Sequence, residues 1–365
     1  MSLQFVDLAT PRALYGAEIE RRMKAVLDHG QFILGPEVAE IEATLADFVG
    51  AAHCVTVSSG TAALELALRA LEIGPGDEVI TPAFTWISTA EVALLVGATP
   101  VLVDIEPTSY CLDPERVRQA ITPRTKAVIA VSLFGQMPDL AALAEICAAQ
   151  NIALIEDGAQ SFGATRNGAR SCGATRIGCT SFFPSKPLGC YGDGGALFTT
   201  DTALAARFQA LRAHGAARRH EHELVGTNAR FDTLQAAVLL AKWPHFAAEL
   251  AARQRIGARY TELLREHCRV PAVALGVTHV FAQYTIAHPQ RDALAQRLKQ
   301  AGIPSAVYYP RCLHEQPVFA GRAVWSDLPV SEKAAREVLS LPMHPYLTEA
   351  DLERVQAVIA AFPGS

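Results

Sequence analysis

The sequence predicts an α/β fold in which a mostly parallel sheet is covered by helices. From residue 51 onward, short runs rich in Val, Ile and Thr alternate with longer helical patterns, which is typical of such a sheet. Each helical pattern is long enough to return the chain to the same edge of the sheet, as parallel strands require. The 365 residues, half of them hydrophobic, fit two domains better than one. We expect an N-terminal segment and a large domain with a seven-stranded sheet at 1–240, and a smaller α/β domain at 241–365.

The expected strands of the large sheet are apolar, β-branched runs bounded by turn residues. They lie at residues 54–57, 78–81, 100–104, 127–132 and 152–156, followed by shorter runs at 178–183 and 196–199. Helices are expected between the first five strands, at residues 62–71, 85–96, 114–121 and 140–150. A long helical stretch at 234–267, with Pro244 as its obvious interruption, can join the two domains. In the small domain we expect strands within 281–289 and 305–310, and helices at 291–301 and 349–362.

Composition and charge argue against several classes of function. The 32 basic and 37 acidic residues give a formal charge of −5 without long runs of like charge, which argues against a nucleic-acid partner. The basic cluster at 212–222 is interpreted as a solvated helix end. The N-terminus lacks a secretory signal pattern, and the longest apolar stretch, 92–103, is shorter than the roughly 20 residues of a membrane-spanning helix. Since the eight cysteines show neither C-x-x-C pairs nor zinc-ligand spacing, we expect a cytoplasmic protein without a metal site or membrane partner.

Candidate ligand-binding residues follow the expected strands, at the edge where open parallel sheets bind their ligands. Ser59, Gly60 and Thr61 lie between a strand and a helix, where free backbone N–H groups can hold a phosphate. On this motif alone, a helix cap made by Ser59 or Thr61 is the favoured interpretation. Trp86 follows the next strand, and its ring is suited either to stacking on a cofactor or to the core.

A carboxylate and a lysine in apolar surroundings are the most informative residues. Asp157 follows an apolar run that indicates a buried strand, so it either caps a helix or pairs with a cation such as a protonated pyridine nitrogen. Gln160 either faces the same ligand or is an ordinary surface residue. Lys186 lies between Pro184 and Pro187 in a phenylalanine-rich and glycine-rich segment, where an apolar environment favours the neutral, nucleophilic amine. A solvent-exposed loop lysine is the alternative.

The order of these residues is more specific than each residue alone. A phosphate cradle, a buried acid and then a lysine about thirty residues later form the order expected of a lysine-bound pyridoxal cofactor. With these residues the sequence resembles the DegT/DnrJ/EryC/StrS-type sugar aminotransferases, which are fold-type I pyridoxal-phosphate enzymes. The matching segments include "SGTAAL", "IEDGAQSFGA", "SFFPSKPLGCYGDGGA", "NARFDTLQAA" and "LPMHPYL". Within the family, the likeness is greatest to bacterial enzymes that aminate carbon 3 of a UDP-linked 3-keto-N-acetylglucosaminuronic acid for surface polysaccharides.

The resemblance implies a role for each candidate residue. Lys186 would bind pyridoxal 5'-phosphate covalently and act as general acid and base, and Asp157 would pair with the pyridine nitrogen. The remaining cofactor contacts implied are Gly60, Thr61 and Ser181 at the phosphate, Trp86 on the ring, Gln160 at the phenolic oxygen, and Asn228 from a neighbouring subunit. Arg230, Tyr308 and Tyr309 are the expected substrate contacts. The resemblance therefore implies a homodimer with shared active sites, a nucleotide-linked ketosugar as substrate and L-glutamate as amino donor.

Three alternatives stay open. The first keeps the chemistry but changes the substrate to another UDP- or dTDP-linked 3-keto or 4-keto sugar, since Tyr308 stands where the uronic-acid enzymes tend to carry histidine. The second is a sugar dehydratase of the same fold, against which Lys186 argues because the dehydratases considered have histidine there. The third is a non-catalytic cofactor-binding regulator, for which the sequence offers no appended DNA-binding module.

Overall fold

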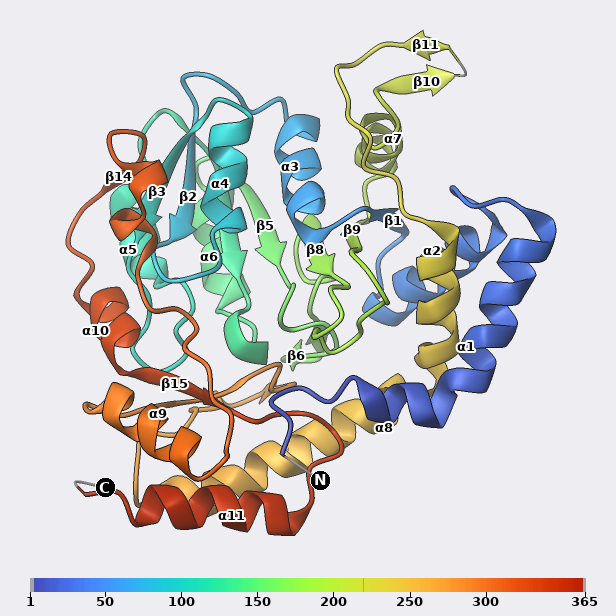
Figure 1. Ribbon diagram of the computed structural model, residues 1–365. Coiled ribbons are helices and arrows are strands. Elements are labelled where there is room, and N and C mark those ends of the chain that lie inside the picture. Colours follow the sequence, from blue (N-terminus) through green and yellow to red (C-terminus); the bar gives the residue numbers. More distant parts are fainter. Residues whose placement is uncertain (1–2, 219, 364–365) are drawn as a thin grey trace.

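An eight-stranded sheet lies at the centre of the computed structural model, which describes residues 3–218 and 220–363 (Figure 1). Its strand order is β1-β9-β8-β5-β4-β2-β3-β14. The strands are β1 (His53–Val57), β2 (Glu78–Pro82), β3 (Thr99–Val103), β4 (Thr125–Val131), β5 (Ala153–Asp157), β8 (Ile177–Ser181), β9 (Gly195–Thr199) and β14 (Val324–Trp325). β9 is antiparallel to β1 and β8, and all other pairs are parallel. The prediction of a mostly parallel sheet is confirmed; all seven expected strands are present, and β14 adds an eighth.

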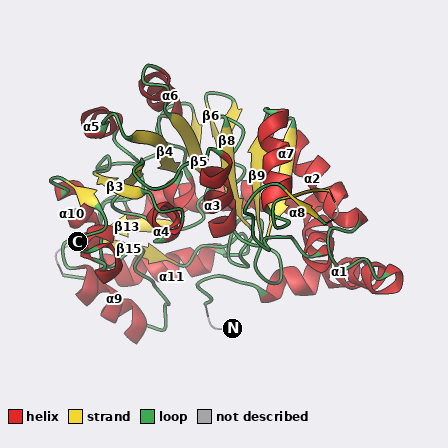
Figure 2. Cartoon of the chain, turned by 90° about the horizontal axis from the view of Figure 1, so that it is seen from above, coloured by secondary structure: helices red, strands yellow, loops and turns green. Residues whose placement is uncertain are grey.

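Helices cover both faces of this sheet, as Figure 2 shows from above. They are α1 (Ala9–His29), α2 (Pro36–Val49), α3 (Gly60–Ala70), α4 (Ser88–Leu95), α5 (Pro114–Ala120), α6 (Leu140–Ala148), α7 (Thr202–Leu211) and α8 (Thr233–Leu264). Successive residues of the strands alternate between the two faces, so Val79 packs with α3, α4 and α7 while Ile80 packs with α2, α5 and α6. Several of the helices begin at side-chain caps, including Ser59 at α3 and Asp139 at α6.

The C-terminal part of the chain forms a second, smaller core around α8. Its antiparallel strands β13 (Tyr284–Ala287) and β15 (Val338–Leu341) pack with α9 (Arg291–Gln300), α11 (Glu349–Ala360) and the second half of α8. α8 runs continuously through Pro244 and through the boundary expected at 240/241, which stays a prediction. Farther along, α10 (Pro329–Glu337) contacts the large sheet again. Its first backbone N–H groups donate hydrogen bonds to the carboxylate of Asp104, which follows β3.

Several short elements lie outside the large sheet and the long helices. Small antiparallel strands pair as β6 (Thr165–Arg166) with β7 (Ala169–Arg170) and β12 (Val277–Thr278), and as β10 (Ala216–Arg218) with β11 (Glu221–His222). Three short 3-10 helices are η1 (Leu133–Gly135), η2 (Leu313–Glu315) and η3 (Pro317–Phe319). The β10–β11 hairpin extends away from the body of the large domain (Figure 1).

Two expectations from the sequence need correction, and one part of the fold was not expected. Residues 305–310 form only an isolated bridge between Ala306 and Ser340, because Pro304 and Pro310 cannot donate hydrogen bonds to a ladder. The first 50 residues contain two helices, α1 and α2, which the sequence analysis did not delimit. Arg212, expected at a solvated helix end, is only 7% exposed, and its guanidinium donates to Glu42 and to the carbonyl of Thr56.

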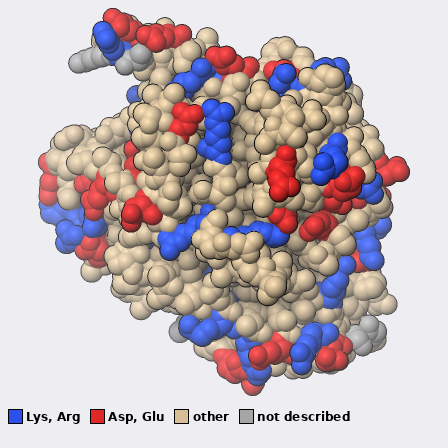
Figure 3. Space-filling model, turned by 180° about the vertical axis from the view of Figure 1, so that it is seen from behind, with Lys and Arg blue, Asp and Glu red and all other residues tan. Residues whose placement is uncertain are grey.

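The surface shows no segregation of charge on the face seen in Figure 3, where acidic and basic side chains are interspersed. Among the residues that the structure describes, no helix combines the length and apolar composition required to cross a membrane.

Candidate active site

The carboxyl ends of the parallel strands bring most of the predicted residues to one edge of the sheet. Asp157 ends β5, Ser181 ends the neighbouring β8, and Trp86 follows β2. Gly60 opens α3 directly beyond β1. Because β1 and β8 are both antiparallel to β9, these four strands point the same way, and their carboxyl ends lie at the edge where open sheets bind ligands in a crevice.

Asp157 is a buried carboxylate with few compensating partners. Its side chain is 7% exposed; Oδ2 accepts a hydrogen bond from Thr89 Oγ1 at 3.0 Å, and Oδ1 accepts one from the Ala159 N–H at 3.2 Å. Burial raises the pKa of Asp157, while these hydrogen bonds and the nearby charge of Lys186 lower it. A carboxylate in this setting suits a cationic ligand atom, such as the protonated nitrogen of a pyridine ring.

Lys186 lies in the loop that connects β8 with β9. Its backbone N–H donates to the Phe183 carbonyl at 2.9 Å, which closes a tight turn between the flanking prolines. Desolvation by the surrounding protein lowers the pKa of Lys186, and the negative charge of Asp157 opposes this shift. The environment therefore agrees with the expected desolvated lysine, and the pKa shift favours the neutral amine needed for attack on a carbonyl.

The cradle predicted for a phosphate is closely packed. A β-carbon at Gly60 would lie 2.8 Å from Cβ of Ser181, so only glycine fits between the start of α3 and the end of β8. The Oγ of Ser59 accepts from the Ala62 N–H at 3.1 Å, so the helix-cap interpretation of this residue is confirmed. The hydroxyl of Thr61 is 2.8 Å from that of Ser88. The start of α3, where the first N–H groups of a helix can bind an anion, thus lies against the carboxyl end of β8.

Gln160, Tyr309 and Trp86 form a second side of the crevice. Gln160 is 5% exposed; its Oε1 accepts from the Phe134 N–H at 2.8 Å, and its Nε2 donates to the Tyr309 hydroxyl at 3.1 Å. The rings of Tyr309 and Trp86 lie 6.0 Å apart, and Trp86 is 58% exposed. Its exposure argues against the core interpretation and leaves a face free for a ligand. Tyr308 is half-buried, beside Tyr309.

Asn228 and Arg230 lie apart from this group. Arg230 Nε donates to Asn228 Oδ1 at 3.0 Å, and both line a hollow of about 410 Å³. The other lining residues are Ile33, Ser58, Gly192, Asp193, Phe231, Asp232 and Gln235. None of Asp157, Lys186, Gln160 and Trp86 lines this hollow. The segment is nevertheless held beside the phosphate cradle, because the Ser58 N–H donates to the Ala229 carbonyl at 3.0 Å.

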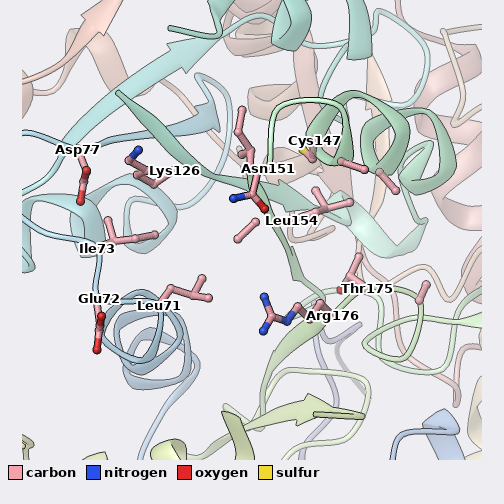
Figure 4. Close-up of a pocket in the computed structure, with 15 residues that line it drawn as sticks. Leu71, Glu72, Ile73, Asp77, Lys126, Cys147, Asn151, Leu154, Thr175 and Arg176 are labelled. Carbon is pink, nitrogen blue, oxygen red and sulfur yellow. The ribbon is translucent and has the colours of Figure 1, made fainter. Parts of the chain in front are cut away.

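A larger hollow of about 650 Å³ lies at the opposite edge of the sheet (Figure 4). It lies at the amino ends of β4 and β5, with Lys126 and Arg176 on opposite sides. No predicted site residue lines it. Its place at the amino ends of the strands separates it from the crevice of the candidate active site.

Two residues of the site were missed in the sequence. The Thr89 hydroxyl donates a hydrogen bond to Asp157. Thr89 lies one helical turn after Trp86, so its place near the predicted site could have been recognised in the sequence. Phe134 holds Gln160 through a left-handed backbone conformation, with φ 58° and ψ −6°. No sequence pattern indicates that conformation at a phenylalanine.

The parallel sheet, the buried acid and the lysine at its carboxyl edge define a pyridoxal-phosphate-dependent transferase of fold type I. The comparison with known families agrees: the chain belongs to the DegT/DnrJ/EryC1/StrS aminotransferase family, whose model matches residues 14–360. It is a sugar aminotransferase, and its cofactor is pyridoxal 5'-phosphate. The crevice fits this cofactor, since it offers a glycine cradle, a buried carboxylate and a desolvated amine.

Two relatives match over almost their full length. The UDP-2-acetamido-2-deoxy-3-oxo-D-glucuronate aminotransferase of Pseudomonas aeruginosa is 49% identical over 98% of this chain and 99% of its own. The UDP-N-acetyl-3-dehydro-alpha-D-glucosamine 3-aminotransferase of Acidithiobacillus ferrooxidans is 44% identical over 98% of this chain and 97% of its own.

Solved structures agree with the fold. An aminotransferase of this family from Brucella abortus superposes with a TM-score of 0.97 at 41% identity and covers 100% of both chains. A Bacillus subtilis protein, with pyridoxamine phosphate bound, superposes with a TM-score of 0.88 at 29% identity over 95% of this chain and 81% of its own.

Proposed function

We propose that this enzyme moves an amino group from L-glutamate to the 3-keto group of a UDP-linked N-acetyl-hexuronic acid, for O-antigen and lipopolysaccharide sugars. The observation that carries the proposal is the 49% identity to the Pseudomonas aeruginosa enzyme over both chains. Transfer through a single cofactor implies two half-reactions in which the donor leaves before the sugar enters.

The residues of the crevice have distinct tasks in this proposal. The cofactor, when bound, supplies a ring that accepts electrons from the carbon that loses a proton. Asp157 keeps a positive charge on the ring nitrogen, and Lys186 Nζ carries the proton in both half-reactions. The N–H groups at Gly60 and Thr61, with the Ser181 hydroxyl, hold the phosphate. Trp86 covers one face of the ring and excludes water from it.

Arg230 is the proposed partner of the sugar carboxylate. Its guanidinium donates through Nε to Asn228, and no carboxylate of the described residues forms an ion pair with it. Asp232 lines the same hollow but does not form an ion pair with Arg230 in the described chain. A guanidinium with its terminal nitrogens free is suited to bidentate binding of a carboxylate.

The test uses two sugars that differ at one position. Purified enzyme receives L-glutamate and either the UDP-linked 3-keto uronic acid or the UDP-linked 3-keto N-acetylglucosamine, and the aminated product is identified by mass. We expect the uronic acid to react with the higher kcat/KM. Arg230→Lys keeps the charge but loses the planar fork, so its kcat/KM with the uronic acid should fall about tenfold or more. Equal use of both sugars by the wild type, with equal slowing by Arg230→Lys, would contradict the uronic acid.

A second candidate substrate is the neutral sugar itself. The Acidithiobacillus ferrooxidans relative, named for a 3-keto N-acetylglucosamine, is 44% identical to this chain. Tyr308 favours this alternative, because it replaces the histidine expected of uronic-acid enzymes. A higher kcat/KM with the neutral sugar in the same assay would select it.

A further inference from the structure

A second buried carboxylate lies beside Asp157 near the end of β5. Glu156 is fully buried, and successive residues of a strand point to opposite faces of the sheet, so its side chain lies on the face away from Asp157. Among the residues that the structure describes, no cationic side chain forms an ion pair with Glu156. A buried carboxylate without a cation costs free energy unless hydrogen bonds compensate for its lost hydration. Costly groups of this kind cluster at functional sites.

Three neutral donors converge on the Glu156 carboxylate. Its Oε1 accepts from the hydroxyls of Ser132 and Ser171, both at 2.7 Å, and its Oε2 accepts from the Cys172 N–H at 2.7 Å. Burial raises the pKa of Glu156, these three hydrogen bonds lower it, and the charge of Asp157 raises it. The carboxylate therefore ties β5 to the residue that follows β4 and to the loop that precedes β8.

Ser132 connects these hydrogen bonds to the backbone of Asp157. Its hydroxyl donates to Glu156, and its N–H donates to the Asp157 carbonyl at 3.0 Å. On the opposite face of the sheet, Thr89 of α4 donates to the Asp157 carboxylate. Asp157 is therefore held from both faces, because Thr89 orients its carboxylate and the contacts of Glu156 hold its backbone.

Another serine connects Glu156 to the far end of the segment 157–161. The hydroxyls of Ser161 and Ser171 lie 2.6 Å apart. An ionised carboxylate only accepts, so the Ser171 hydrogen points to Glu156 and the Ser161 hydroxyl donates to Ser171. Ser161 directly follows Gln160, the expected contact of the phenolic oxygen of the cofactor. Glu156 thus holds both ends of the segment that carries two expected cofactor contacts.

Gly158 lets the loop at 171–172 approach this segment closely. A β-carbon at Gly158 would lie 2.5 Å from Sγ of Cys172 and 2.8 Å from Oγ of Ser171. A larger residue would have to displace both side chains, and Ser171 is one of the donors to Glu156. The backbone next to Asp157 is therefore matched to the loop that Glu156 binds.

We propose that Glu156 is a positioning residue for the cofactor, which fixes the segment 157–161 so that the Asp157 carboxylate stays within reach of the pyridine nitrogen. The inference rests on the role proposed for Asp157 and not on the identity of the sugar. Glu156 itself faces away from the crevice, so it acts only through its neighbours and its charge. That charge acts in the same direction, because a second anion one residue from Asp157 also favours a cationic ring nitrogen.

The experiment measures the Kd of pyridoxamine 5'-phosphate by calorimetry, on the full-length enzyme freed of cofactor. This ligand carries an amine in place of the aldehyde and forms no covalent bond with Lys186, so its Kd reports the noncovalent contacts alone. A 1-deaza analogue, in which carbon replaces the ring nitrogen, is titrated in parallel. The analogue has no ring charge for Asp157 to bind, so it shows whether an effect passes through that carboxylate.

Glu156→Gln keeps the shape of the side chain and removes its charge. Because the Cys172 N–H only donates, the amide oxygen must face it, and the amide nitrogen then faces Ser132 and Ser171 and reverses their hydroxyls. The Kd of pyridoxamine phosphate should rise about tenfold, which corresponds to about 1.4 kcal/mol. The Kd of the 1-deaza analogue should rise by no more than about twofold, whereas a role in folding alone would weaken both ligands alike.

Ser132→Ala is a milder variant that leaves Glu156 in place. It removes the hydroxyl that links Glu156 to the backbone of Asp157, so the Kd of pyridoxamine phosphate should rise about threefold, again without a similar rise for the analogue. If Glu156→Gln yields no folded protein, the result for Ser132→Ala decides.

Glu78→Gln is the matched control. Glu78 is also buried, and it binds Thr122 and Arg124 at the amino end of β2, so the same substitution removes a buried carboxylate at the opposite edge of the sheet. It should lower the unfolding free energy but leave both Kd values within about twofold of the wild type.

The outcomes distinguish two failures. If the wild type binds pyridoxamine phosphate no more tightly than the 1-deaza analogue, Asp157 does not bind the ring nitrogen, and its proposed role falls together with the inference. If the wild type prefers pyridoxamine phosphate but the variants of Glu156 and Ser132 weaken both ligands equally, or neither, Glu156 supports only the fold and the inference alone is overturned.

Discussion

Lys186 is expected to bind the cofactor covalently. Its lowered pKa and its place beside Asp157 favour a neutral amine that attacks the cofactor aldehyde. Borohydride reduction of the loaded enzyme, followed by peptide mapping, should therefore find the cofactor on Lys186. Lys186→Ala should lose essentially all transfer activity. Reduced cofactor on the peptide of Lys242, a buried lysine that contacts the same loop, would contradict the assignment.

His279 is expected to make the stability of the protein depend on pH. It is 3% exposed, its Nδ1 accepts from the Phe281 N–H at 2.9 Å, and burial lowers its pKa from 6.5 to about 3. In the unfolded chain the imidazole of His279 is protonated below about pH 6.5. In the folded protein it stays neutral down to about pH 3. The contribution to stability is full above pH 6.5 and is lost as the pH falls, by about 2 kcal/mol at pH 5.

The measurement for His279 compares the unfolding free energy at pH 7 and pH 5 in urea. His279→Asn keeps an acceptor for the Phe281 N–H but does not titrate, so its free energy should depend less on pH, by about 2 kcal/mol over this interval. Carboxylates that titrate in the same interval are common to both proteins and cancel. An identical pH dependence in the two proteins would show that His279 does not govern it.

The site residues differ in how far the sequence could predict them. Asp157 and Lys186 were predictable because a charge beside an apolar run requires a partner, and the structure brings the two close enough for their charges to interact. The sequence carries the Thr89 hydroxyl, but not the fold that aims it at Asp157. Phe134 contacts Gln160 through its backbone N–H, so the identity of its side chain does not indicate that hydrogen bond.

Helix α8 packs against the loop between β8 and β9, which carries Lys186. Lys242 on α8 is 9% exposed, and its Nζ donates to the Gly189 carbonyl within the loop. Gln235, two turns earlier, accepts from the Tyr191 N–H at 2.8 Å. These two side chains tie the loop that carries Lys186 to the helix that links the two cores.

Lys242→Met tests this support. Methionine fills a similar volume but leaves the buried Gly189 carbonyl without its donor, so the unfolding free energy should fall by about 1–3 kcal/mol. The loosened loop should also release the cofactor faster on dilution. Lys299→Met, an exposed lysine on α9, is the control and should stay within about 0.5 kcal/mol of the wild type. Equal effects of the two substitutions would mean that Lys242 does not hold the loop.

Elements with strong periodicity were predictable, and those set by contacts between distant segments were not. The first five strands and α3 to α6 follow from short apolar, β-branched runs that are separated by longer helical patterns. The segment 305–310 has the composition of a strand. Its contacts are a hydrogen bond from the Gln160 side chain to Tyr309 and a bridge from Ala306 to Ser340, and only the fold determines these partners. β14 pairs with β3 from more than 200 residues away, and a two-residue strand gives no periodic signal.

In a single chain, the residues expected to form one active site lie in two groups. Asn228 and Arg230 line a hollow that does not include Lys186. Apolar residues border this hollow: Ile33, one of its lining residues, is 46% exposed, and Phe32 beside it is 47% exposed. Exposed apolar side chains that rim a polar hollow favour a protein partner, and a second copy of the chain would place its own Asn228 against the phosphate cradle.

We predict that the active sites are shared between two subunits. Lys186→Ala and Asn228→Ala chains, each inactive alone, are mixed under conditions that allow subunits to exchange. If Asn228 acts across the interface, each mixed dimer contains one site with both residues intact, so about a quarter of the wild-type activity should return at equal mixing. If Asn228 acts within its own chain, every site in every dimer lacks one of the two residues and no activity returns. Exchange is verified by mass spectrometry of differently tagged chains, so mixed dimers without activity would rule out the sharing of sites.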